Sequence, residues 1–340
     1  MNSRNFLLLL FIAGLYIANG AYAFQNNPDE KIAIFPFENF SGDKIAPEVV
    51  MPMVRSRLET KGYSVLKEED LNAFLLKERI RNAGCVSKET AMKIGNELKV
   101  KTILTGAVNT FSGGNDPRAG FVVCLINTTD GSLIWANHAA AAGEDFEKIL
   151  GIGKIEALNK LSERVLDILF KSFTALPPEK HPESSYRIAV MPFQNKSKVK
   201  DMGMMATFMF IVELFRNKKF IPLEYGDVRR LVIDLRLKEK GEIDLKNTES
   251  IAGLAGVEGI VVGSVDFYRE GSAIGVPPEA EISARLVSAG TGKILWYNSY
   301  HAKGDDNLII LDWGRIRSPE NVAYKAVEKL VKNMGKVKWR

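Results

Sequence analysis

Apolar and polar positions along the chain follow one pattern twice. Residues 31–43 read KIAIFPFENFSGD, and residues 187–197 read RIAVMPFQNKS. In both segments a short apolar run with β-branched residues ends in Pro-Phe, an Asn-x-Ser turn follows, and helical periodicity comes next. The pattern therefore predicts a strand, a turn and a helix that are used twice.

The agreement between the two segments extends well beyond this opening motif. The matched pairs are Pro36 and Pro192, Phe37 and Phe193, Asn39 and Asn195, Ser41 and Ser197, Gly84 and Gly241, Gly106 and Gly263, Gly131 and Gly292, Trp135 and Trp296, and Gly143 and Gly304. Gaps between the copies fall only where loops are expected. We therefore infer a duplicated domain and not a solenoid of short repeats.

Each copy is expected to alternate strands with helices and to end in three strands and a helix. In the first copy the periodicity predicts strands at 32–37, 63–66, 102–111, 121–126 and 132–138, and helices at 47–60, 70–80, 87–98 and 154–173. Asp130-Gly131 is a tight-turn signal, so the last strands should pair antiparallel. This order predicts an α/β fold made of two tandem copies of a mixed-sheet α/β domain.

The two ends of the chain carry different signals. Residues 1–23 contain Arg4, the apolar run FLLLLFIAGLYI and Ala21-Tyr22-Ala23, which is typical of a signal peptide cut after Ala23. An uncleaved anchor is disfavoured because a spanning helix needs about 20 apolar residues. We expect the first domain at 24–173, a Pro-rich linker at 174–186, the second domain at 187–335 and a solvated basic tail at 336–340.

Composition and charge narrow the class of partner. The chain has 340 residues, of which 46% are hydrophobic and 26% charged, so each half can bury its own core. The formal net charge of +5 is spread along the chain without a dense Lys/Arg stripe. A nucleic-acid surface is therefore not expected.

Cysteine and histidine content gives little support to a metal or redox site. Cys85 and Cys124 are the only cysteines, and the second copy has Glu242 and Arg285 at the corresponding places. A disulfide between them is open, but free cysteines are favoured because a domain of this size does not depend on one. The three histidines, His138, His181 and His301, are isolated, so no metal ligand set is predicted.

The Pro-Phe-x-Asn-x-Ser turns are the sharpest candidate sites. They comprise Asn39, Ser41 and Asp43 in the first copy and Asn195 and Ser197 in the second. Each turn follows a strand and precedes a helix, which is where open α/β sheets place ligands or partners. Asn and Ser also bond their own backbone in turns, so a purely structural role is favoured.

The segment 202–215, MGMMATFMFIVELF, is a second candidate. It is nearly free of charge and includes Met204, Met205 and Met209, whose side chains adapt to varied partners. A helix that is apolar all round is usually buried, so packing between the domains or across a dimer is favoured over an exposed partner groove. The corresponding helix of the first copy is more polar, with Arg55, Arg57 and Glu59.

No catalytic constellation emerges from the sequence. Gly290-Thr291-Gly292-Lys293 lacks the first glycine and the Ser/Thr of a phosphate loop. No Ser/His/Asp order is shared by the two copies. We therefore expect a protein that is not an enzyme and needs no cofactor.

The segments IAIFPFENFSGD, GYSVLKEEDL, LKVKTILTGAV and DGSLIWA are similar to those of the CsgG-like group of bacterial envelope proteins. That group includes the curli secretion lipoprotein, the LpoB activator of penicillin-binding proteins and the similar N-terminal domain of TolB. The resemblance implies an anticodon-binding-like α/β fold and a non-catalytic role through protein contacts. This chain lacks a lipidation cysteine after the signal, and its hairpin loops at 112–120 and 270–279 are short and rich in Gly and Pro.

These observations lead to an expected function. We expect a periplasmic scaffold or assembly factor that binds envelope proteins, with peripheral outer-membrane association left open. One alternative is a subunit of an oligomeric secretion or export assembly at the outer membrane, which would require a homo-oligomer. Another is a periplasmic protein that binds a small ligand at the strand-end turns.

Overall fold

The computed structural model describes residues 31–147, 153–175, 185–236, 245–271, 275–306, 308 and 314–339. The predicted signal peptide and most of the predicted linker lie outside the described residues, and the domain boundaries given above remain predictions. The elements from β1 to α5 form the N-domain, and those from β7 to α9 form the C-domain.

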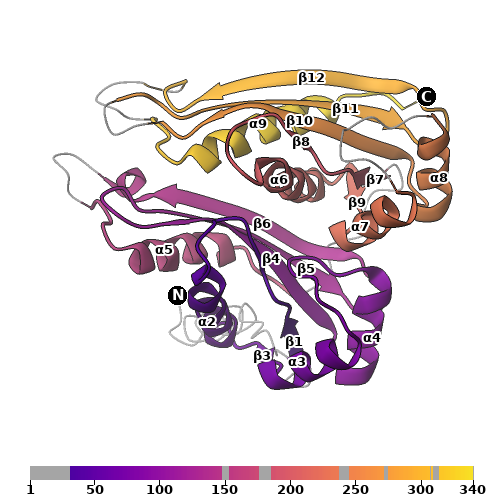
Figure 1. Ribbon diagram of the computed structural model, residues 1–340, viewed down its shortest axis with the longest axis horizontal. Coiled ribbons are helices and arrows are strands. Elements are labelled where there is room, and N and C mark those ends of the chain that lie inside the picture. Colours follow the sequence, from indigo (N-terminus) through magenta and orange to yellow (C-terminus); the bar gives the residue numbers. More distant parts are fainter. Residues whose placement is uncertain are drawn as a thin grey trace, which may run out of the picture.

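The N-domain contains a mixed sheet and its helices (Figure 1). Its elements are β1 (Lys31–Ile34), β2 (Glu38–Asn39), α2 (Ala46–Thr60), β3 (Ser64–Val65), α3 (Glu68–Lys77), α4 (Lys88–Leu98), β4 (Thr102–Ser112), β5 (Arg118–Asn127), β6 (Leu133–Ala142), the 3-10 turn η1 (Gly143–Phe146) and α5 (Leu158–Phe170). The strand order is β3-β1-β4-β5-β6, with β2 also paired to β4. Strand β1 pairs in parallel with β3 and with β4. Strand β5 pairs antiparallel with β4 and with β6, as the turn signals predicted.

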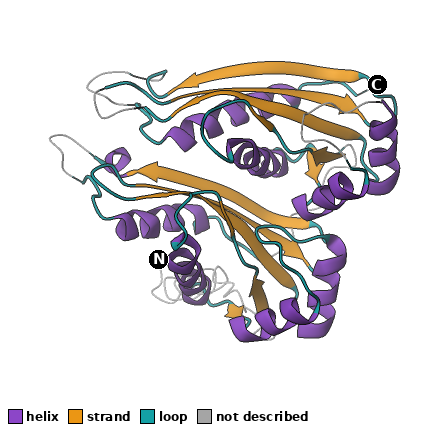
Figure 2. Ribbon diagram, in the orientation of Figure 1, coloured by secondary structure: helices purple, strands orange, loops and turns teal. Residues whose placement is uncertain are grey.

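The C-domain has the same topology (Figure 2). Its elements are β7 (Tyr186–Val190), β8 (Gln194–Asn195), α6 (Met202–Arg216), β9 (Phe220–Pro222), α7 (Tyr225–Asp234), α8 (Leu245–Ala255), β10 (Gly259–Arg269), β11 (Glu279–Ser288), β12 (Ile294–Lys303) and α9 (Pro319–Met334). The strand order is β9-β7-β10-β11-β12, with β8 paired to β10. The fold is therefore α/β with two tandem mixed-sheet domains, as the repeated pattern predicted.

Several predicted boundaries were wrong for identifiable physical reasons. Helix α5 begins at Leu158 and not at residue 154, because the Ile155 N–H donates to the Gly143 carbonyl at 3.1 Å and holds this segment extended. The strand predicted to reach Phe37 ends at Ile34, and the chain rejoins the sheet at β2. Helix α3 begins at Glu68 and not at residue 70, because Glu68 and Glu69 lie inside its first turn. Ser87 caps α4 as a helix-start residue should.

The two sheets and two pairs of helices stack in layers (Figure 1). Helices α2 and α5 cover one face of the N-domain sheet through a core that includes Val54, Val165 and Leu104. The opposite face of that sheet packs on α6 of the C-domain, and α6 and α9 in turn lie against the C-domain sheet. One apolar core thus runs from the N-domain sheet through α6 into the C-domain.

The two matched tryptophans, Trp135 and Trp296, differ in burial. Trp135 is buried, and its indole N–H donates to the Ser172 carbonyl at 3.1 Å. Trp296 is half-buried, and its indole N–H donates to Asn333 Oδ1 at 2.8 Å. The expectation of a solvated tail was wrong for Trp339, whose ring stacks on Tyr186 with ring centroids 4.0 Å apart.

Candidate functional site

The first strand-end turn is closed by its own side chains. Asn39 Oδ1 accepts the Ser41 N–H at 3.1 Å and the Ser41 hydroxyl at 2.7 Å, and Asn39 Nδ2 donates to the Asp43 carbonyl at 2.7 Å. Ser41 Oγ accepts the Asp43 N–H at 3.2 Å, and Asp43 Oδ1 accepts the Ile45 N–H at 3.1 Å. These bonds fix the path from β2 to α2.

The second turn repeats this geometry. Asn195 Oδ1 accepts the Ser197 N–H at 3.0 Å and the Ser197 hydroxyl at 2.7 Å, and Asn195 Nδ2 donates to the Val199 carbonyl at 2.7 Å. The shared Asn-x-Ser spacing is thus explained by a structural role. Partner binding by Asn39, Ser41, Asp43, Asn195 and Ser197 remains a prediction.

Segments from both turns meet at one crevice between the domains. The ring of Phe40 packs against Phe208 of α6, with ring centroids 5.9 Å apart. Phe40 and Ser41 line a cavity of about 220 Å³ together with Val199 and Lys200, which follow the second turn. The sequence predicted each turn, but it did not predict that the two turns lie close together in the folded chain.

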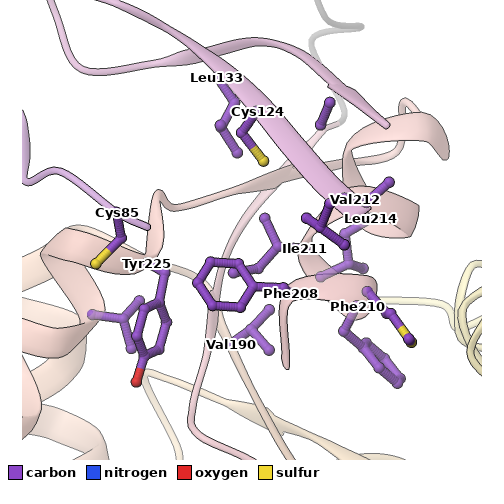
Figure 3. Packing of buried hydrophobic residues seen from close by; sticks show 14 of the residues in the cluster. Cys85, Cys124, Leu133, Val190, Phe208, Phe210, Ile211, Val212, Leu214 and Tyr225 are labelled. Atoms are coloured by element: carbon purple, nitrogen blue, oxygen red, sulfur yellow. The ribbon is translucent and has the colours of Figure 1, made fainter. Parts of the chain in front are cut away.

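The methionine-rich helix α6 lies between the domains, which confirms the favoured interpretation of its apolar sequence. Met205 and Met209 are buried, and Met204 is half-buried. In Figure 3, Cys124 and Leu133 of the N-domain sheet lie on the side of α6 that carries Ile211 and Val212. All four residues belong to one apolar core. Met205 and Met209 serve internal packing here, and contact of the three methionines with an external partner remains a prediction.

A buried polar cluster fixes α9 on the N-domain sheet. The carboxylate of Glu320, at the start of α9, accepts hydrogen bonds from Asn109 Nδ2 at 2.7 Å and the Thr110 hydroxyl at 2.6 Å. His138 Nε2 of β6 lies 2.9 Å from Glu320 Oε1. Gly120 of β5 leaves room for this carboxylate, because an added Cβ would lie 1.8 Å from Glu320 Oε2.

A second contact between the domains joins the starts of α4 and α7. Glu224 caps α7 and also accepts the Val86 N–H of the N-domain at 3.2 Å. Asp227, in the first turn of α7, accepts the Lys88 N–H at the start of α4 at 2.9 Å. Gly226 permits this approach, because a Cβ there would lie 2.5 Å from the Ser87 nitrogen.

Both cysteines are free and buried, in agreement with the favoured prediction. Burial raises the pKa of the Cys85 thiol to about 12, and burial also raises the pKa of Cys124. A thiol needs its thiolate form to react, so neither cysteine is suited to nucleophilic or redox chemistry at neutral pH.

Among the described residues, no helix or strand covers one face of the C-domain sheet (Figure 1). In β6 of the N-domain every residue except Asn137 is buried, whereas in the equivalent β12 only Ala302 is buried. Ile294 and Tyr297 of β12 are 59% and 67% exposed, and Phe267 of β10 is 40% exposed. We call this surface the open face, defined by Phe267, Glu281, Ser283, Arg285, Ile294, Tyr297 and His301.

The open face differs chemically from the covered face of the N-domain sheet. By the alignment of the copies, Val122, Cys124 and Ala136 of the covered face correspond to Ser283, Arg285 and Tyr297 of the open face. The first three belong to the core shared by the domains. The duplication has therefore produced one sheet buried on both faces and one sheet with a mixed polar and aromatic surface.

Within the described parts of the chain, no group of three or more His, Cys, Asp or Glu side chains could hold a metal ion. Over the same residues, no helix has the length and apolar character needed to cross a membrane.

No protein-family model matches the chain, and no curated protein matches it. Solved structures with a similar arrangement include the PelC dodecamer from Paraburkholderia phytofirmans, with 13% identity over 45% of this chain and 92% of that chain and a TM-score of 0.31. The lipoprotein GNA1162 from Neisseria meningitidis has 17% identity over 44% of this chain and 97% of that chain, with a TM-score of 0.32.

The C-terminal domain of LpoB from Escherichia coli is also similar, with 15% identity over 36% of this chain and 86% of that chain and a TM-score of 0.26. Each of these matches spans less than half of this chain. At these identities and TM-scores no activity or partner is transferred from them.

The residues that join the domains were not singled out by motif or periodicity. Glu224 and Glu320 correspond to Lys67 and Asn159 in the first copy, and both of those residues are exposed. The available signal was the difference between the copies. At the cap of α7, Glu224 stands where the first copy has Lys67, and Gly226 stands where it has Glu69. In the first turn of α9, Glu320 stands where the first copy has Asn159.

Proposed function

We propose that the chain is an exported, non-catalytic scaffold or assembly factor of the bacterial cell envelope, and that its open face is the surface that binds another envelope protein. The observation that carries this proposal is the unequal burial of two equivalent sheets. The same face that is covered by helices in the N-domain is left exposed in the C-domain, with Tyr297 67% exposed.

The chain itself provides a template for the occupant of this face. The N-domain sheet is covered by α6 and α9, a pair of helices that supply apolar side chains together with the acidic Glu320. The partner that we propose is therefore a different protein that lays helices with apolar and acidic residues across the open face. Tyr297 and Ile294 would contribute the exposed apolar area, since aromatic side chains dominate such contacts.

Export and the cell envelope enter this proposal from the sequence. The signal-peptide pattern of residues 1–23 and the motifs that resemble the CsgG-like group support both. The oligomeric secretion assembly remains an alternative in which a second copy occupies the open face. The crevice lined by Ser41 and Lys200 is the place where the small-ligand alternative would act.

A crosslinking pull-down of residues 24–340 from the cell's own envelope tests the proposal. We compare the wild type with an open-face variant, Ile294→Lys with Tyr297→Lys, and with a control on the exposed side of α5, Lys160→Glu. We expect a heterologous partner that is recovered with the wild type and the control and falls by about tenfold or more in the open-face variant, because loss of a central anchor costs about 2 kcal/mol.

Equal thermal midpoints of the three proteins would show that folding does not cause the difference. Recovery of the partner with the open-face variant would contradict the proposal. Recovery of self-crosslinked chains alone, abolished by the open-face variant, would replace it by the oligomeric alternative.

A further inference from the structure

Glu224 is a buried carboxyl group placed where the two domains meet. It is 5% exposed, and its two oxygens accept the N–H groups of Val86 in the N-domain and Gly226 in its own helix. Among the described residues, no Lys, Arg or His side chain forms an ion pair with it. A carboxylate in such a place loses the solvation of water without gaining a cation.

The groups around Glu224 do not compensate its charge. From its own helix α7, Asp227 adds a second carboxyl group, while Arg229 faces Cys85. From the N-domain, its titratable neighbours include the neutral thiols of Cys85 and Cys124, and Lys88 and Asp130 line the same pocket as Glu224. The cations Lys88, Arg187 and Arg230 act on Asp227, whose own carboxylate is engaged by the Lys88 N–H.

The carboxylate of Glu320, at another contact between the domains, is compensated. The Glu320 carboxylate receives Asn109, Thr110 and His138, so three side chains hold it at one end of the interface. The uncompensated carboxyl group lies between α4 and α7. An opening of the interface should therefore begin at the α4–α7 contact while the Glu320 cluster holds.

We propose that Glu224 is a proton-dependent latch between α7 and the segment before α4, which holds this contact closed when the carboxyl group is protonated and weakens it when the group is ionised.

The direction of the pH dependence follows from the pKa. Burial raises the pKa of Glu224 from 4.5 to about 8 in the closed structure, against the opposing effect of the two N–H groups. Opening exposes the group to water, and its pKa returns toward the ordinary value of about 4.3. The closed contact is therefore most stable in acid, loses stability as the pH rises through the interval between the two values, and changes little above pH 8.

Amide hydrogen exchange at Val86 and Lys88, corrected for the intrinsic pH dependence of exchange, tests the latch in the full mature chain. We expect the opening constant of the wild type to rise with pH between 5 and 8, by up to about tenfold per pH unit, and then to level off. Glu224→Gln keeps the size of the side chain and removes its charge, so its opening constant should be nearly independent of pH.

The matched control is Glu89→Gln, an exposed residue of the same interface that pairs with Arg230. It should keep the slope of the wild type. An equal slope in Glu224→Gln and the wild type would overturn the proposal. If Glu224→Gln fails to fold, the wild type decides alone, because a flat opening constant between pH 5 and 8 would also overturn it.

Discussion

Glu320 is 1% exposed, and its carboxylate bonds to strands of the other domain. Removal of a carboxylate from water costs several kcal/mol unless donors replace the lost solvation. Asn109, Thr110 and His138 provide these donors, and Gly120 provides the space. Because these hydrogen bonds are directional, they fix the position of α9 on the N-domain sheet. Apolar packing alone would define that position less closely.

Replacement of Glu320 should therefore cost far more than replacement of its counterpart in the first copy. Glu320→Ala leaves the side chains of Asn109, Thr110 and His138 without their acceptor, and we expect the free energy of unfolding to fall by about 3–5 kcal/mol. Asn159→Ala, at the equivalent exposed place on α5, should change it by less than about 0.5 kcal/mol. Urea unfolding of both variants measures the difference, and similar costs would show that the cluster does not stabilise the interface.

At the scale of one element, α6 and α2 show how duplicated helices acquire different neighbours. They occupy equivalent places, and both bury one stripe against their own sheet, as Val54 and Phe210 do. On the opposite side α6 carries Ile211 and Val212, which are buried against the N-domain, where α2 carries Arg55 and Ser56. The second apolar stripe of α6 exists because a second sheet covers it.

A charge on that second stripe should be tolerated in α2 and not in α6. Val212→Asp places a carboxylate in the core shared by the domains, and we expect a loss of more than about 3 kcal/mol in the free energy of unfolding. Ser56→Asp, at the equivalent exposed place, should stay within about 0.5 kcal/mol of the wild type. Thermal and urea unfolding measure both, and a harmless Val212→Asp would mean that α6 is not enclosed.

The sequence was informative about elements because the signals for them are local. Periodicity and turn residues predicted the duplication, the order of strands and helices, and the burial of α6. The contact of Asn109 with Glu320 joins residues 211 positions apart, and that of Val86 with Glu224 joins residues 138 apart. No local pattern encodes such pairs, because they depend on how two folded domains dock. Only the divergence between copies at these positions pointed to them.

For the whole molecule, the layers end in two different surfaces. At one end α2 and α5 expose charged residues such as Glu163 and Lys160, and at the other end the C-domain sheet exposes the open face. In the described part of the chain, neither end repeats the buried apolar surfaces that join the two domains, so we do not expect the internal contact to continue between copies. This favours a heterologous partner over self-assembly on the open face.

Site-specific photocrosslinking in the living cell tests whether the open face binds another envelope protein. A photoreactive residue replaces Tyr297 on the open face in one protein and Lys160 on α5 in another, and the adducts are identified by mass. We expect an adduct with one other envelope protein from position 297 and none of that mass from position 160. Absence of any adduct from position 297, or the same adduct from both positions, would contradict the assignment of the open face as the partner surface.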